Sequence, residues 1–133
     1  MKQIVCLLML LTILLSGCTS RKVDMDNRRN LEFTVVDKEQ IPPELASIIA
    51  ERRADEFSMT YSLEGYLYIA VGYGTRETGG YSISVDELCE TDTSVIIDTN
   101  LIGPKSGEPV NKMATYPYVV VKLEYKDKNV IFE

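Results

Sequence analysis

The chain has 133 residues, with 14 Lys and Arg against 20 Asp and Glu, and a formal net charge of −6. This acidic balance disfavours nucleic acid as a partner, because clustered cations are needed to bind its phosphates. The sequence contains no histidine, which excludes Ser-His-Asp triads, Cys-His pairs and His-liganded zinc. We therefore expect a protein that is not an enzyme and that uses no metal or cofactor.

Residues 1–17 have the pattern of an export signal. Lys2 precedes a twelve-residue apolar run, 4–15, which is shorter than the roughly 20 residues that span a membrane. Two small residues stand directly before Cys18, and Leu15 lies three positions before it. This arrangement resembles the lipobox of bacterial lipoproteins. The resemblance implies cleavage before Cys18, lipidation of its thiol, and an exported protein held at the bacterial cell membrane, facing outside the cytoplasm.

Three cysteines are present, and only Cys89 lies outside the signal and the lipobox. A single cysteine cannot form an internal disulfide or a four-thiolate metal site. We predict that Cys89 is a small buried side chain at the end of a strand.

The first folded elements follow a polar segment. Residues 18–30 are charged and aperiodic, which predicts a flexible tether. Residues 31–36 are rich in β-formers and predict a first strand, with Leu31, Phe33 and Val35 on one face.

A short amphipathic helix is predicted from Pro43 to about Arg53. Proline suits the first helical position, because its missing N–H would be unpaired there anyway. Apolar residues follow at helical spacing, so one face of the helix should lie on a sheet. We expect Arg52 and Arg53 on the solvated face, with Arg52 paired to Glu56.

Period-two alternation dominates the rest of the chain. It predicts strands at 57–63, 66–73, 81–88, 94–101, 118–125 and 129–132. Glu64-Gly65 is a moderate hairpin signal, and Asp127-Lys128 is expected to form the last turn. Residues 101–115 contain too many glycines and prolines for a regular element, so they form a long loop that is either functional or mobile. The prediction is one domain, 31–133, of class α+β: a mainly antiparallel sheet of about six to seven strands with one short helix.

The glycines at 72–80 do not form a nucleotide-binding loop. Glu77 occupies the position where the dinucleotide fingerprint needs glycine, and a strand follows instead of a helix. The neighbouring carboxylates Asp86 and Glu87 point to opposite faces of a strand, which is poor geometry for shared acid-base chemistry.

Two short motifs stand out among the eight tyrosines, all of which fall in the β region. They are TGGY at residues 78–81 and YPY at residues 116–118. With the order of segments over residues 67–124, they closely resemble the PrcB C-terminal domain family, bacterial surface domains named for a subunit of a protease complex. The resemblance implies an exported, often lipid-anchored accessory protein that binds and stabilises a protease without catalysis of its own.

These motifs supply the candidate partner-binding residues. Glycines allow positive φ and close approach of another backbone, and proline restricts the preceding residue to extended conformations. If both motifs lie at the same end of the sheet, their tyrosines should form one aromatic patch suited to a protein partner. The candidates are Gly79, Gly80, Tyr81, Tyr116, Pro117 and Tyr118.

Two alternatives remain open. Residues 78–81 are similar to the loop of chagasin-type inhibitors of cysteine proteases, with one extra glycine, and this likeness implies an inhibitor. The other alternative is a small-ligand-binding surface domain, or an enzyme that depends on Cys89, a lysine or carboxylates.

Overall fold

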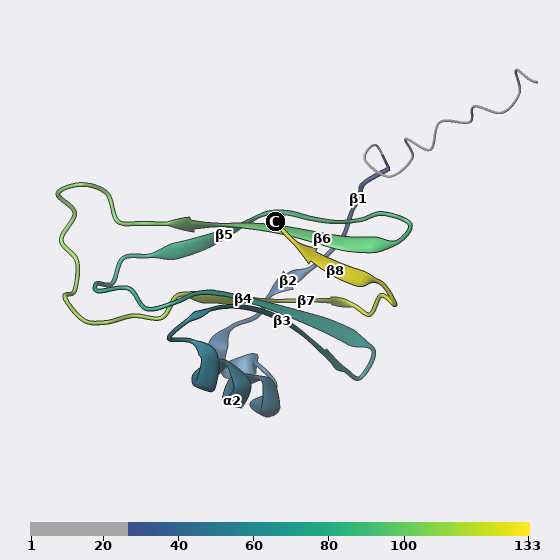
Figure 1. Ribbon diagram of the computed structural model, residues 1–133, viewed down its shortest axis with the longest axis horizontal. Helices are drawn as coiled ribbons and strands as arrows, with labels where there is room; N and C mark the ends of the chain where they lie inside the picture. The colour runs from purple at the N-terminus through teal and green to yellow at the C-terminus, as the bar shows by residue number, and fades with distance from the viewer. Residues whose placement is uncertain (1–26) are drawn as a thin grey trace, which may run out of the picture.

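The computed structural model describes residues 27–133, so the export signal and Cys18 lie outside the described residues. Two four-stranded sheets make up the fold (Figure 1). The first sheet has the order β1 (Arg29–Asn30), β5 (Ser82–Glu90), β6 (Ser94–Ile102), β8 (Asn129–Phe132). The second has the order β2 (Thr34–Val35), β7 (Tyr118–Glu124), β4 (Tyr66–Tyr73), β3 (Glu56–Leu63). Among the described helices, none has the length and apolar character to cross a membrane.

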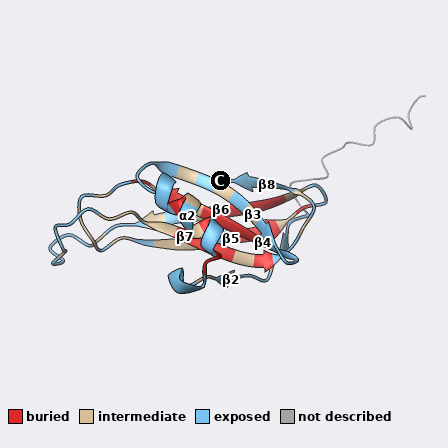
Figure 2. Cartoon of the chain, turned by 90° about the horizontal axis from the view of Figure 1, so that it is seen from below, coloured by how far each residue is buried: buried red, intermediate tan, exposed pale blue. Residues whose placement is uncertain are grey.

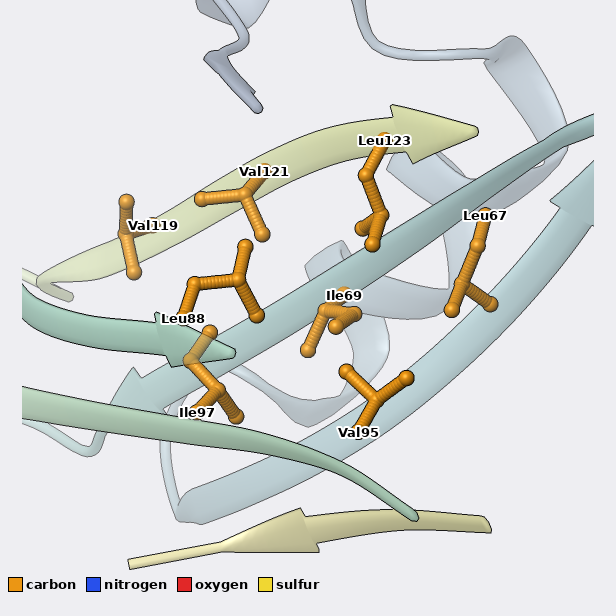
Figure 3. Packing of buried hydrophobic residues seen from close by; sticks show 8 residues of the cluster. All are labelled: Leu67, Ile69, Leu88, Val95, Ile97, Val119, Val121 and Leu123. Carbon is orange, nitrogen blue, oxygen red and sulfur yellow. The ribbon is translucent and has the colours of Figure 1, made fainter. Parts of the chain in front are cut away.

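The main core lies between the two sheets. Alternate residues of β4 and β7 point inward and meet residues of β5 and β6, as expected for strands whose side chains alternate between faces. Figure 3 shows these side chains converging from both layers. They are Leu67, Ile69, Leu88, Val95, Ile97, Val119, Val121 and Leu123.

The helix α2 (Pro43–Arg52) covers the outer face of the second sheet (Figure 1). A short 3-10 turn, η1 (Lys38–Gln40), precedes it. Leu45 and Ile49 are buried in a second apolar cluster with Tyr68, Ala70 and Val120. The predicted helix and its apolar face are confirmed. With eight strands in two mostly antiparallel sheets and one short α-helix, the predicted α+β class is confirmed as well.

The predicted single strand at 31–36 is wrong, because this part of the chain crosses between the sheets. Asn30 pairs with Cys89 in the first sheet, whereas Val35 pairs with Val121 in the second. Each pairing lasts two residues, and strand pairing begins at Arg29. The three residues expected on one face also differ in burial, since Leu31 packs against the core and Val35 is 55% exposed.

The last strand also changes sheet. The chain bends at Asp127-Lys128, as the turn signal predicts, but β8 does not return along β7. It pairs with β6 of the other sheet, in the parallel direction. As a result, β3 is left as a long edge of the second sheet, and the four-residue β8 is the neighbouring edge of the first.

The turn between β3 and β4 places a non-glycine residue in the left-handed region. Glu64 and Gly65 both have positive φ, 51° and 83°, which is the type I′ geometry that suits a two-residue hairpin. Glutamate is unfavourable in this region because its Cβ crowds the backbone, whereas asparagine tolerates it.

Glu64→Asn is therefore expected to raise the free energy of unfolding by about 0.5–1 kcal/mol. Urea denaturation measures this gain. Glu64→Ala is the matched control, because it removes the charge and keeps the strain. If the alanine variant were as stable as the asparagine variant, backbone strain at the turn would not be the cause.

Candidate protein-binding site

Two loops that are distant in sequence lie side by side at one end of the sandwich. We call residues 74–81 and 103–117 the loop pair. Arg76 and Thr115 form an isolated antiparallel bridge, in which each backbone N–H donates to the other residue's carbonyl, at 2.8 and 2.9 Å. Figure 1 shows both loops together at the left, with 103–117 reaching farther out. The two sequence motifs therefore lie at the same end of the sandwich, which was the condition for a shared aromatic patch.

The TGGY motif anchors the longer loop through hydrogen bonds. The Thr115 hydroxyl donates to the carbonyl of Thr78 at 2.7 Å. The N–H of Gly79 donates to the carbonyl of Asn111 at 2.8 Å. Thr78 and Gly79 are half-buried, whereas Gly80 is exposed, so the longer loop covers only part of this segment. The inhibitor alternative requires that these residues contact a protease, and Gly80 is the exposed residue among them.

Gly80 packs closely against the longer loop. Its φ is +89°, and a Cβ at this position would lie 3.1 Å from Pro104 Cβ and 3.1 Å from Val110 Cγ1. Position 79 does not require glycine. Its φ is not positive, and a Cβ there would lie at an ordinary contact distance of 3.8 Å from Asn111. Only the second glycine of the pair is required by the backbone and by packing.

Tyr81 is half-buried and does not belong to the main core. Its ring lies near Gly103, where a Cβ would be 3.4 Å from Tyr81 Cε1. The Arg76 guanidinium lies 5.8 Å from the centre of the Tyr81 ring, and Arg76 Nη2 donates to the Tyr73 carbonyl at 3.0 Å. These contacts make Tyr81 a support for the start of the long loop.

The YPY motif faces the helix side of the second sheet. The Arg53 guanidinium lies 4.3 Å from the ring centre of Tyr116, and Lys38 Nζ lies 5.0 Å from that of Tyr118. The Pro117 carbonyl accepts from the Tyr73 N–H at 3.0 Å. Arg53 is exposed, as expected, and its guanidinium also forms a cation–π contact with the half-buried Tyr116 ring.

The expected pairing of Arg52 with Glu56 does not occur among the ion pairs of residues 27–133. The predicted single aromatic patch is also absent from this part of the chain. Tyr118 packs on the helix-side cluster, whereas Ile83, two residues after Tyr81, packs on the core between the sheets. The rings therefore form separate cation–π pairs.

The most exposed part of the loop pair is the outer run of 103–117. Residues 105–109 and 111–114 are exposed, and Met113 is 63% exposed. Sequence reasoning did not single out Met113, although an apolar residue in a polar loop was the available signal. A loop that is hydrogen-bonded along its inner side and carries an exposed, adaptable methionine is suited to contact another protein.

The remaining polar groups of residues 27–133 give little support to an enzymatic function. Cys89 is buried, as predicted, and its burial raises the pKa of the thiol, so the reactive thiolate is disfavoured. Its Sγ donates to Glu87 Oε1 at 3.3 Å. That bond and the ion pair with Arg28 lower the pKa of Glu87. Among the described residues, no group of three His, Cys, Asp or Glu could hold a metal ion.

A hollow of about 900 Å³ lies away from the loop pair, where the crossing segment passes the end of β7. Tyr66 and Lys122 line it, and none of the six candidate residues does. The fold and the exposed loop thus define a small β-rich domain with an exposed loop at one end.

The family described as PrcB C-terminal has a model that matches residues 67–124. This match confirms the resemblance found in the sequence over these residues. The match runs from β4 to β7 and contains the whole loop pair, while α2, β3 and β8 lie outside it. No curated protein and no solved structure matches the chain.

Proposed function

We propose that the protein is a membrane-anchored lipoprotein that acts as a non-catalytic accessory module. It binds or stabilises an extracytoplasmic protease or another envelope protein. The observation that carries this proposal is the PrcB C-terminal match over residues 67–124, because the family is named for a subunit of a protease complex.

The loop pair supports this proposal as the partner-binding surface. Its outer run is exposed, and its inner side is fixed to the 74–81 loop by backbone and side-chain hydrogen bonds. A loop that is already ordered loses little conformational entropy on binding, which favours affinity. In this proposal Met113 contacts the partner, while Gly80 and Tyr81 hold the loop in place.

The membrane anchor is proposed from the lipobox pattern at Cys18. Two acyl chains hold a protein stably at a membrane, whereas one chain binds only reversibly. Labelling cells with radioactive palmitate should mark the wild-type protein and leave Cys18→Ala unmarked. Labelling of the alanine variant would place the lipid elsewhere.

Affinity purification of the tagged, detergent-solubilised lipoprotein tests the function. A secreted protease should be recovered in stoichiometric amount and with full activity. Met113→Asp should lose it, whereas Tyr125→Asp, which changes another exposed residue just after the end of β7, should retain it. Failure to recover any partner would contradict the proposal, and recovery of an inhibited protease would favour the inhibitor alternative.

A further inference from the structure

β3 is a long edge strand without the usual protection. It pairs with β4 over all eight residues, and no other described strand pairs with it. Edge strands of soluble proteins are commonly blunted by lysine, proline, bulges or short length, since unpaired backbone groups attract another chain. The sequence EFSMTYSL has none of these devices and carries one charge, at Glu56.

The hairpin geometry identifies the unpaired backbone groups. In a two-residue hairpin the residues that flank the turn form a hydrogen-bonded pair, and such pairs recur at every second residue. Leu63 and Tyr66 flank this turn, so odd-numbered residues of β3 bond to β4. The N–H and C=O groups of Ser58, Thr60 and Ser62 therefore point away from the sheet.

The same three residues border a groove between the two sheets. Their side chains face away from the helix-side cluster, in which Met59 and Tyr61 pack. The groove has a volume of about 410 Å³, and Leu67, Val130 and Phe132 form its apolar wall. All three hydroxyl residues are exposed, and Figure 2 shows β3 mostly in the exposed colour near β8. Small polar side chains leave room here for larger ones.

The two ends of the groove differ in charge. Glu51, Asp55 and Glu56 surround the start of β3 together with Arg52, and none of these four residues belongs to an ion pair within residues 27–133. At the other end, Lys126 and Lys128 are already paired with Glu90. The hydrogen bond from Lys128 is the main reason that the pKa of Glu90 lies below its ordinary value. Asp127 also lines the groove at the lysine end. At the start of β3 three carboxylates stand against one guanidinium, so the free charge near Glu56 is negative.

We propose that β3 docks an extended segment of a partner polypeptide, which adds an antiparallel strand to the sheet. Backbone groups of Ser58, Thr60 and Ser62 pair with the added strand. Apolar side chains at alternate positions fill the groove against Val130 and Phe132. Because the added strand runs antiparallel, its C-terminal end lies beside Glu56 and carries a lysine or arginine.

A second copy of the chain fits this edge less well. If β3 paired with its own copy, the residues entering the groove would be serine and threonine, which are too small and polar to cover Phe132, itself 37% exposed. The mismatch favours a partner strand with larger apolar residues. This surface is distinct from the loop pair, so the inference does not rest on the protease being the partner.

A backbone substitution tests the proposal on the full chain in detergent. Thr60→Pro removes one outward N–H without breaking a bond to β4, and proline is tolerated at such edge positions. Thr60→Ala is the matched control because it keeps the N–H. The probe is a dye-labelled peptide, acetyl-Thr-Val-Thr-Val-Thr-Val-Lys-amide, followed by fluorescence anisotropy.

Wild type and Thr60→Ala should bind the peptide with similar affinity, and Thr60→Pro about tenfold more weakly, the effect of one lost hydrogen bond. Bound peptide should also slow amide exchange at residues 58, 60 and 62. Thr60→Lys keeps the backbone and places a charge in the groove, so it should weaken binding even if the proline variant does not fold.

Three results would overturn the proposal. They are the absence of saturable binding, equal binding by wild type, Thr60→Pro and Thr60→Lys, or a dimer in sedimentation that Thr60→Pro dissociates. The last result would assign the edge to a second copy. None of them affects partner capture through Met113, so failure here is distinguishable from failure of the proposed function.

Discussion

Gly72→Ala is expected to lower the free energy of unfolding by about 2 kcal/mol, as overpacking substitutions typically do. Gly72 is the cross-strand partner of Phe57, whose ring lies over it. A Cβ at position 72 would lie 2.5 Å from Phe57 Cδ1 and 2.7 Å from Cζ, closer than atoms can approach. The ring would have to leave the helix-side cluster in which it packs.

A double-mutant cycle separates this overlap from the general effect of alanine in a strand. In a Phe57→Ala background the added methyl group has free space, and Gly72→Ala should be neutral or stabilising by about 0.5 kcal/mol, because glycine weakens strands. Urea denaturation of the four proteins gives the coupling energy. If Gly72→Ala cost the same in both backgrounds, the Phe57 ring would not be the cause.

The local elements could be predicted because their patterns depend on nearby residues. Alternation in 66–73 and 118–125 follows directly from inward and outward faces, and Leu67, Ile69 and Val121 do form the core. Sheet membership could not be predicted in this way. The crossing at 31–36 and the parallel pairing of β8 with β6 depend on partners more than 30 residues away, which local periodicity does not encode.

The position of the candidate site could be predicted from the sequence, but the directions in which its tyrosine rings point could not. TGGY and YPY do meet at one end, yet Tyr81 lies near Arg76 and Tyr116 under Arg53. Which way a ring points depends on its sheet and on cations supplied by other segments. That β3 is an exposed edge strand could not be predicted from the sequence either. Its alternating sequence is typical of a central strand as much as of an edge, and only the sheet order distinguishes the two.

Gly80→Ala and Gly79→Ala are expected to differ sharply, although both replace a glycine of the same motif. Alanine at position 80 must adopt a φ of +89° and press on Pro104 and Val110. The left-handed conformation alone costs about 1–2 kcal/mol. Alanine at position 79 has ordinary contacts and should leave stability within about 0.5 kcal/mol of wild type.

Gly80→Ala and Gly79→Ala should also differ in their affinity for the partner. A displaced 103–117 loop no longer presents Met113 correctly, so Gly80→Ala should weaken capture of the recovered partner by about tenfold, a loss near 1.4 kcal/mol. Amide exchange at Thr115 should accelerate in this variant, because its bridge to Arg76 is loosened. Gly79→Ala should change neither quantity. If it abolished partner binding while stability and exchange stayed normal, Gly79 would contact the partner itself, and the TGGY motif would be part of the binding surface as well as the support of the loop.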